Sequence, residues 1–269
     1  MIATDGSLMQ WSRFAGLAAA LFALAGCSHH GKTSVAPTPS ELAPIHAATT
    51  ASVPTYVPGP RPPSRIPITP VPPGGVSTED LEFVASHRPI LTQEGLATWY
   101  TAPYKGRKSA NGQVFDDNAM TAAHRTLPMG SLVEVTNLRT GQSAVMRITD
   151  RGPFVEGRML DLTMASAKAI GIYRIGMSQV RMDVYQTPKP ITQGGRWCVQ
   201  IGAFHKESDA LKLKAQLIRK YSDANVIEFP GEKSYWVRIR PGGDDRKMAE
   251  FIAQHLQPSE GEAYLTRLD

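Results

Sequence analysis

Apolar and polar residues alternate along several short runs in the middle of the chain, as they do in β-strands with one buried face. The clearest run is residues 143–149, in which every second residue is apolar: Ala144, Met146 and Ile148. A similar run at 132–137 precedes it, and Gly141 lies between the two. Because a glycine favours a tight turn between strands, the two runs predict a β-hairpin.

Further strands are predicted at residues 97–100, 160–162 and 178–185. One short helix is expected to begin after Thr163, whose hydroxyl can cap it, and to end at Gly171. Many short strands with a single brief helix predict a small closed β-barrel.

The last part of the chain shows a different pattern, in which a strand followed by an amphipathic helix occurs twice. A strand at 197–204 precedes a helix expected to start at Ser208, with four residues on one face: Ala210, Leu213, Leu217 and Tyr221. A strand at 234–239 then precedes a second helix, with apolar residues at core spacing: Met248, Ile252 and Leu256. With linking strands near 224–229 and 263–267, the pattern predicts a four-stranded antiparallel sheet with two helices.

The beginning of the chain has the pattern of an export signal. Arg13 precedes an apolar stretch at 14–25 that is shorter than the roughly 20 residues needed to span a bilayer. The sequence Leu-Ala-Gly-Cys ending at Cys27 resembles the bacterial lipobox, in which the cysteine is lipidated after cleavage, and Ser28 resembles an outer-membrane sorting signal. We therefore predict a signal peptide at 1–26 and a membrane anchor on Cys27, the alternative being a buried cysteine in an apolar helix.

Proline distribution separates the anchor from the folded regions. Twelve of the 21 prolines lie between Pro37 and Pro73, where neither a helical nor a strand period is present. Since proline fixes φ and removes a backbone donor, residues 27–90 are predicted to be a disordered, extended tether. The remaining boundaries are a barrel domain at 91–186, a linker at 187–195 and a second domain at 196–269.

Charge and motif content exclude several functional classes. The net charge of +5 could suggest nucleic-acid binding, but basic and acidic residues nearly balance over 196–269, and export argues against such a partner. The sequence contains no glycine-rich phosphate loop and no spacing typical of metal ligands. We expect no nucleic acid, no metal and no cofactor.

Asp150 is the most informative single residue, because it ends an alternating strand immediately before Arg151 and a Gly-Pro break. A carboxyl group held rigidly in a partly desolvated groove can keep a proton near neutral pH and act as a general acid. The alternative is an aspartate that only caps a turn, for which this sequence is also suitable. Two other acids, Asp116 and Asp117, are more typical of a solvated turn.

Residues 93–186 resemble the rare lipoprotein A family of septal lytic-transglycosylase-like proteins. The resemblance lies in "TAAH" at 121–124, "LPMG" at 127–130, "VTNL" at 135–138 and "DRGPF" at 150–154. It implies a double-psi β-barrel, and a substrate made of peptidoglycan glycan strands.

The resemblance also implies roles for individual residues. Asp150 would be acid and then base in forming a 1,6-anhydro product, His124 would assist it, and Arg151 and Asn111 would bind substrate. Gln113 stands where the family usually has glutamate, and an amide cannot exchange a proton. The barrel could therefore cleave glycan or only bind it.

Residues 196–269 resemble the sporulation-related repeat (SPOR) domain through "VQIGAF" at 199–204 and "WVR" at 236–238. Alternation predicts that Val199, Ile201, Val237 and Ile239 face the helices. Gln200, Trp236, Arg238 and Arg240 are then expected to share the open face. Sugar is expected to bind through Gln200, Trp236 and Arg238, with Phe204 as a further candidate. The resemblance implies binding to glycan strands that lack stem peptides, which accumulate at division sites.

Together these features predict a lipoprotein of the bacterial envelope, anchored in the outer membrane, that cleaves peptide-free glycan strands at the septum. Division-machinery proteins are possible partners. A non-catalytic wall-binding protein is the main alternative, and a structural spacer between membrane and wall is a third.

Overall fold

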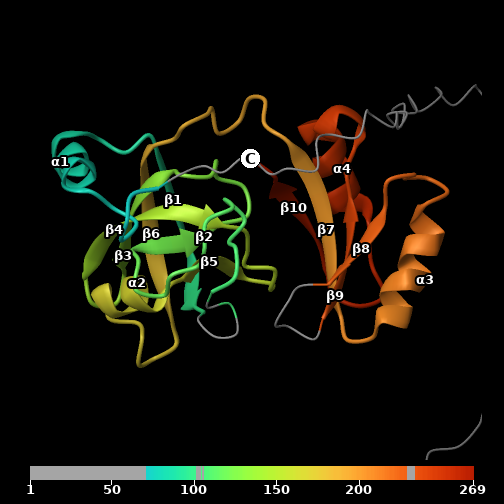
Figure 1. Cartoon of the computed structure of the whole chain (residues 1–269), viewed down its shortest axis with the longest axis horizontal. Coiled ribbons are helices and arrows are strands. Elements are labelled where there is room, and N and C mark those ends of the chain that lie inside the picture. Colours follow the sequence, from blue (N-terminus) through green and yellow to red (C-terminus); the bar gives the residue numbers. More distant parts are fainter. Residues whose placement is uncertain (1–70, 101–103, 105, 229–233) are drawn as a thin grey trace, which may run out of the picture. The chain divides into compact units, whose positions relative to one another are not determined.

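The computed structural model describes residues 71–100, 104, 106–228 and 234–269 (Figure 1). The predicted signal peptide, Cys27 and most of the predicted tether lie outside the described residues. Within these ranges, no helix combines the length and the apolar character that crossing a bilayer requires.

A closed barrel of six strands forms the first folded region, as the alternating runs predict. The strands are β1 (Leu91–Trp99), β2 (Thr121–Ala123), β3 (Leu132–Asn137), β4 (Ser143–Asp150), β5 (Arg158–Leu162) and β6 (Met177–Gln186). Their order around the barrel is β1-β5-β2-β4-β3-β6, and β6 pairs with β1 to close it (Figure 1). Strands distant in sequence, such as β2 and β5, are therefore neighbours.

The barrel interior is filled by the apolar residues of the alternating pattern. On β4, Met146 and Ile148 are fully buried, as their spacing predicts. The other strands contribute the same kind of side chain to one cluster, including Ala97, Ala122, Val133, Leu160, Leu162, Val180, Met182 and Val184. This packing fixes which residues point outward, because successive side chains of a strand alternate between its two faces.

The predicted short helix is confirmed as α2 (Met164–Ala169). The Thr163 hydroxyl accepts a hydrogen bond from the N–H of Ser166, and it also donates to the carbonyl of Ala119 at 2.7 Å. Gly171 follows the helix with φ +74°, a conformation that favours glycine. Thr163 thereby ties the end of β5 to the loop that leads into β2.

One helix lies inside the segment predicted to be disordered, so the prediction of a structureless tether up to residue 90 is wrong. Helix α1 (Thr78–Ser86) begins with a capping box, in which Ser77 and Asp80 each accept a hydrogen bond from the other's backbone N–H. The nearby prolines lie before Ser77 or after the end of the helix at Ser86, so none interrupts it.

The second folded region contains β7 (Trp197–Phe204), α3 (Glu207–Leu217), β8 (Asn225–Glu228), β9 (Tyr235–Ile239), the short 3₁₀ helix η1 (Gly242–Asp244), α4 (Arg246–His255) and β10 (Glu262–Arg267). The four strands form one antiparallel sheet in the order β10-β7-β9-β8, as predicted (Figure 1). Val199, Ile201, Val237 and Ile239 are fully buried in one core with α3 and α4 residues, as their alternation indicates.

The expected Ser208 cap is wrong. Helix α3 begins at Glu207, with Lys206 at the N-cap and no side-chain capping bond. Ser208 therefore lies in the first turn, where its hydroxyl cannot cap the helix.

Helix α1 is joined to the barrel by an ion pair between Asp80 and Arg147 of β4. The Arg147 Nε atom lies 3.1 Å from Asp80 Oδ2, and a second guanidinium nitrogen contacts Oδ1, so the contact is bidentate. Burial alone would raise the pKa of Asp80, but the hydrogen bonds from Arg147 and Ser77 outweigh it and lower that pKa. The ionised carboxylate therefore stabilises the folded state.

We expect Asp80→Asn to lower the free energy of unfolding at pH 7 by about 1–3 kcal/mol, because Arg147 loses a largely buried anionic partner. Urea unfolding of the native protein and the variant measures this. The lowered pKa requires the difference to persist down to about the ordinary value of 3.8 and to disappear below the folded-state pKa. Glu82→Gln, on the exposed side of α1, is the control. Equal effects of the two substitutions would contradict the anchoring role.

Candidate functional site

Four outward-facing residues form a row across neighbouring strands of the barrel. Thr98 of β1 pairs with Asp161 of β5, Asp161 pairs with Ala123 of β2, and Ala123 pairs with Asp150 of β4. Directly paired residues share a face of a sheet, so both carboxylates are assigned to the face that holds Ala123. A register irregularity between Ala122 and Ala123 breaks the regular alternation of β4 here, which lets Asp150 share that face although it follows the inward Ile148 by two residues. With strands spaced about 4.8 Å apart, the two Cα atoms are separated by about 10 Å.

Asp150 is held in place by hydrogen bonds to both of its carboxylate oxygens. Its Oδ1 atom accepts hydrogen bonds from the N–H groups of Ala110 at 3.0 Å and Arg151 at 2.8 Å. Its Oδ2 atom lies 3.5 Å from the hydroxyl of Tyr100, which donates to it. Burial raises the pKa of Asp150 above 3.8, although these hydrogen bonds and the Arg151 charge act in the opposite direction. The carboxyl group therefore retains a proton more readily than an exposed aspartate.

Asp161 is a second acid of this row that the sequence reasoning did not single out. Its Oδ1 atom accepts a hydrogen bond from the Thr98 hydroxyl, and Oδ2 forms an ion pair with Arg158 at 3.2 Å. A polar residue between the core residues Leu160 and Leu162 is the signal that could have indicated it.

Tyr100 is affected electrostatically by both acids. Burial raises its pKa well above 10, and the charges of Asp150 and Asp161 raise it further. Its hydroxyl therefore remains protonated and available as the donor to Asp150 over the whole physiological range.

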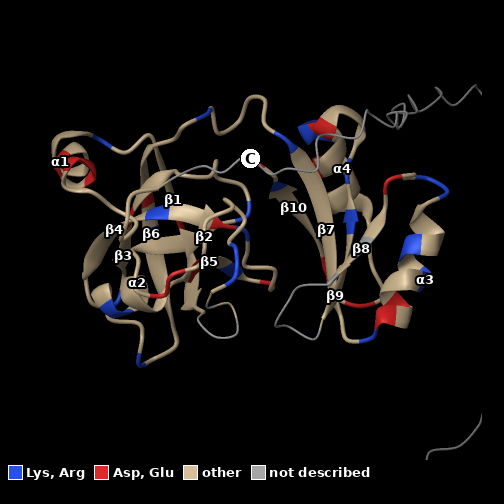
Figure 2. Cartoon of the chain, in the orientation of Figure 1, with Lys and Arg blue, Asp and Glu red and all other residues tan. Residues whose placement is uncertain are grey.

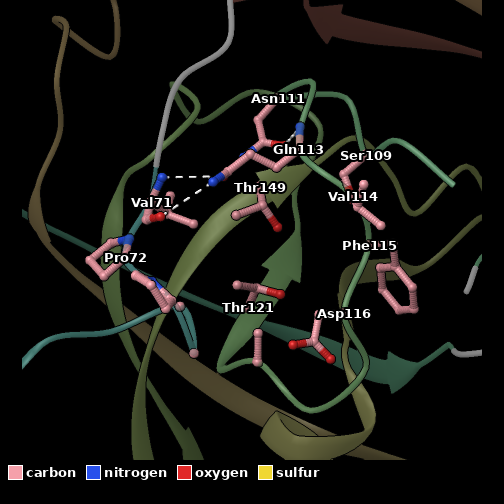
Figure 3. Close-up of a pocket in the computed structure, with 14 residues that line it drawn as sticks. Val71, Pro72, Ser109, Asn111, Gln113, Val114, Phe115, Asp116, Thr121 and Thr149 are labelled. Carbon is pink, nitrogen blue, oxygen red and sulfur yellow. Dashed lines mark hydrogen bonds between the residues drawn. The ribbon is translucent and has the colours of Figure 1, made fainter. Parts of the chain in front are cut away.

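The loop that contains Asn111 and Gln113 lies next to Asp150, as the resemblance implies. Asn111 is buried, and its N–H donates to the carbonyl of Thr149 at 3.1 Å. Its side chain orients Gln113: Nδ2 donates to Gln113 Oε1 at 2.6 Å, and Oδ1 accepts from the Gln113 N–H at 3.0 Å. Gln113 also bonds to the main chain of Val71 (Figure 3).

A cavity of about 220 Å³ lies beside this loop. Figure 3 shows the residues that line it, which include Val71, Pro72, Ser109, Asn111, Gln113, Phe115, Asp116, Thr121 and Thr149. Thr149 of the cavity wall directly precedes Asp150 on β4, and Ala110, whose N–H bonds to Asp150, lies between the lining residues Ser109 and Asn111.

His124 is buried next to Asp150, but the contact between the two is made by the backbone. The His124 N–H donates to the carbonyl of Asp150 at 3.1 Å. Its ring Nδ1 accepts hydrogen bonds from the N–H groups of Thr126 and Leu127 at 3.2 and 3.0 Å, which assigns the ring proton to Nε2. Burial, together with the charges of Arg151 and Arg125, lowers its pKa to about 3. The imidazole is therefore neutral at physiological pH.

Arg151, predicted to bind substrate, directs its guanidinium to main-chain carbonyls of the protein. It donates to the carbonyl of His124 at 3.0 Å, to that of Arg267, and to that of Asp269 at 2.9 Å. Burial lowers its pKa to about 9, which leaves it charged at pH 7. These bonds stabilise the turn that follows Asp150.

The prediction of an open, sugar-binding face on the second domain is wrong. Gln200 and Trp236 are 0% and 2% exposed, and Phe204 is part of the core, so none of these three lies on an open face. The indole packs on Gly202, where no side chain intervenes, and its ring centroid is 5.3 Å from that of Phe154. Arg238 is half-buried and donates to Gln200 Oε1 at 2.9 Å.

No three His, Cys, Asp or Glu side chains come together as potential metal ligands within the described ranges of the chain. The described acids of the site are instead paired with hydroxyl, N–H and guanidinium groups.

Comparisons with known proteins define the class. The double-psi β-barrel family model described as lytic transglycolase matches residues 92–182, and the SPOR domain model matches residues 193–266. The chain is thus a double-psi β-barrel protein with a C-terminal SPOR domain.

Related proteins identify the family. A probable endolytic peptidoglycan transglycosylase RlpA of Synechocystis sp. is 55% identical over 92 residues, which cover 34% of this chain and 29% of that protein. The endolytic peptidoglycan transglycosylase RlpA of Pasteurella multocida is 39% identical over 124 residues, 46% of this chain and 42% of that protein. The protein of the same name from Neisseria meningitidis is 34% identical over 170 residues, 61% of this chain and 71% of that protein. The chain belongs to the RlpA (rare lipoprotein A) family, although it spans less than half the length of the first two relatives.

We expect Asp150→Asn to raise the melting temperature at pH 7 by a few degrees, because the folded state no longer holds a partly desolvated carboxylate. A raised pKa means that the native protein loses stability as the pH rises through and above 3.8, so the difference should vanish below that pH. Thermal unfolding between pH 3 and pH 7 measures it. Asp116→Asn, at an exposed position, is the control. A variant that is less stable than native at pH 7 would contradict the assigned electrostatics.

Proposed function

We propose that this protein is an endolytic lytic transglycosylase that cleaves peptidoglycan glycan strands. The observation that carries the proposal is the half-buried Asp150 carboxyl group, whose pKa is raised and whose orientation is fixed by Ala110, Arg151 and Tyr100. A glycosidic bond breaks readily only if its leaving oxygen receives a proton, and a carboxyl group whose pKa is raised supplies one more readily than an ordinary aspartate.

The proposed reaction uses Asp150 twice. Its proton passes to the glycosidic oxygen as the bond to the anomeric carbon breaks, which leaves positive charge on the sugar ring. The resulting carboxylate then removes the proton of the same sugar's 6-hydroxyl, and that oxygen bonds to the anomeric carbon. The product carries a 1,6-anhydro ring, and Asp150 regains its proton without the participation of water.

Asp161 has the complementary role in this scheme. It lies on the same row of residues, accepts a hydrogen bond from Thr98 and forms an ion pair with Arg158. A carboxylate near the reacting sugar stabilises the positive charge that develops at the anomeric carbon. The two acids would thus have different roles.

The second domain and the amino-terminal region indicate where the protein would act in the cell envelope. The SPOR match supports a role in holding the protein on glycan strands that lack stem peptides, which would enrich it at the division septum. The lipobox-like sequence ending at Cys27 supports a lipid anchor in the outer membrane, with the proline-rich segment as the connection. Division-machinery proteins are the proposed protein partners.

A second candidate function is a non-catalytic wall-binding protein. It is favoured by one observation, the amide at Gln113, because the position usually holds an acid and this side chain is engaged with Asn111 and Val71. In that case the groove would bind glycan without cleaving it.

Mass spectrometry of glycan strands incubated with the purified protein separates the two functions. We expect 1,6-anhydro-ended products from peptide-free strands, and fewer from strands that retain stem peptides. Asp150→Asn should lower the rate about 10²- to 10⁴-fold, the usual contribution of a general acid, while strand binding is retained. Glu82→Gln should behave like the native protein. Binding by the native protein without any anhydro product would support the wall-binding function instead.

A further inference from the structure

Gln113 makes an unusual contact for a residue at a catalytic position, because it pairs with both main-chain groups of a single residue. The N–H of Val71 donates to Gln113 Oε1 at 3.2 Å, and Gln113 Nε2 donates to the carbonyl of Val71 at 3.3 Å (Figure 3). A carboxamide that bonds both groups of one residue imitates the pairing that a neighbouring β-strand provides. This contact recognises an extended backbone and does not depend on the side chain of residue 71.

The segment that follows Val71 is fastened to the barrel again at Gly74, whose carbonyl accepts a hydrogen bond from the Met120 N–H at 2.7 Å. The N–H of Gly75 donates to the carbonyl of Pro72 at 2.9 Å, which closes a turn within the segment. Gly75 has φ +90°, and a Cβ atom there would lie 2.5 Å from the Met120 carbonyl oxygen, so only glycine fits. We call residues 71–75 the strap.

Beyond the strap, helix α1 is held by the ion pair between Asp80 and Arg147. The chain from Val71 to Asp80 is therefore bound to the barrel at its beginning, its middle and its end. Gln113 provides the first of these attachments, at the point where the predicted tether enters the folded domain.

The strap is also part of the candidate site. Its residues Val71, Pro72, Pro73, Gly74 and Gly75 all line the 220 Å³ cavity, together with Ser109 and Asn111 from the neighbouring loop and with Thr121 and Thr149 from the barrel wall. Asp150 directly follows Thr149, and the loop fixes its Oδ1 atom through Ala110. Movement of the strap would change the shape of the cavity beside the acid.

The chemistry of the contact accounts for an amide at position 113. A glutamate could accept from the Val71 N–H and from Asn111 Nδ2, but it could not donate to the Val71 carbonyl. Its carboxylate would instead face a carbonyl oxygen, which is unfavourable in a partly buried place. Glutamine satisfies both groups of Val71.

We propose that Gln113 is a positioning residue that clamps the strap at Val71, so that the strap forms one wall of the glycan-binding groove, which we identify with the 220 Å³ cavity. This inference rests on the proposed glycan-binding function of the barrel. It assigns Gln113 to substrate fit and not to proton transfer.

Hydrogen exchange of the Val71 amide tests the clamp itself. In full-length protein labelled with [¹⁵N]valine, the amide should exchange slowly in the native protein and about three- to tenfold faster in Gln113→Glu, because the variant loses one of the two bonds. Val71→Ala identifies the signal by removing it. An unchanged exchange rate in Gln113→Glu would overturn the clamp.

Cleavage kinetics on peptide-free glycan strands test whether the clamp affects substrate binding. Val71→Pro removes the N–H that Gln113 accepts, and it suits the extended conformation that Pro72 already favours for residue 71. We expect Val71→Pro and Gln113→Glu to raise KM about three- to tenfold, with kcat and its pH profile unchanged. Glu82→Gln, at an exposed position outside the strap and the cavity, is the control and should behave like the native protein.

Two results would contradict the inference. An increase in kcat and a shift of the pH profile in Gln113→Glu would assign the position to proton transfer. A KM for Val71→Pro equal to that of the native protein would remove the strap from the groove. A failure of the proposed enzymatic function can be distinguished from a failure of the strap inference by measuring strand binding. If the native protein binds strands without cleaving them, a weaker Kd in Val71→Pro supports the strap, and an unchanged Kd overturns it.

Discussion

The candidate site depends on the pairing of one very short strand with two others. Strand β2 contributes only three residues, yet Ala123 pairs with Asp150 on one side and with Asp161 on the other. A shift of one residue in either pairing would turn a carboxylate from the outer face toward the core. The register is maintained by the inward residues, because Ala122, Ile148 and Leu162 are fully buried in the same cluster. The hydrophobic core of the barrel thus determines where the acids stand.

The same arrangement gives the two acids different electrostatic environments. Asp150 is bonded to two N–H groups and a tyrosine hydroxyl, and its burial outweighs these contacts and raises its pKa. Asp161 has a guanidinium partner in Arg158. Neighbouring carboxyl groups in unlike surroundings are the usual basis for dividing acid and charge-stabilising roles between two side chains. This division supports a proposed chemistry that requires no cofactor.

The barrel was largely predictable from the sequence because its strands alternate cleanly and its helix α2 has a clear cap at Thr163. The pairing of β2 with both β4 and β5 was not, because residues 121–123 are too few to show a period and their partners are distant in sequence. Asp161 was missed for this reason. Asp150 was identified because a strand end followed by Gly-Pro is a local signal.

Other differences arise from contacts that alternation does not describe. Alternation correctly assigned Val199 and Ile201 to the helix-facing side, but it could not show that Trp236 is also covered on the opposite side of the sheet. Helix α1 had a readable capping box at Ser77, which the density of nearby prolines obscured. The role of Gln113 depends on Val71, 42 positions away in the chain, so no local pattern could indicate it.

The central claim is that Asp150 holds its proton more tightly than an ordinary aspartate. Carbon-detected NMR titration of protein labelled with [¹³Cγ]aspartate measures this directly, and the signal that is absent from Asp150→Asn identifies the residue. The account predicts a pKa above the ordinary value of 3.8. A carboxyl group that titrates at or below that value would contradict it.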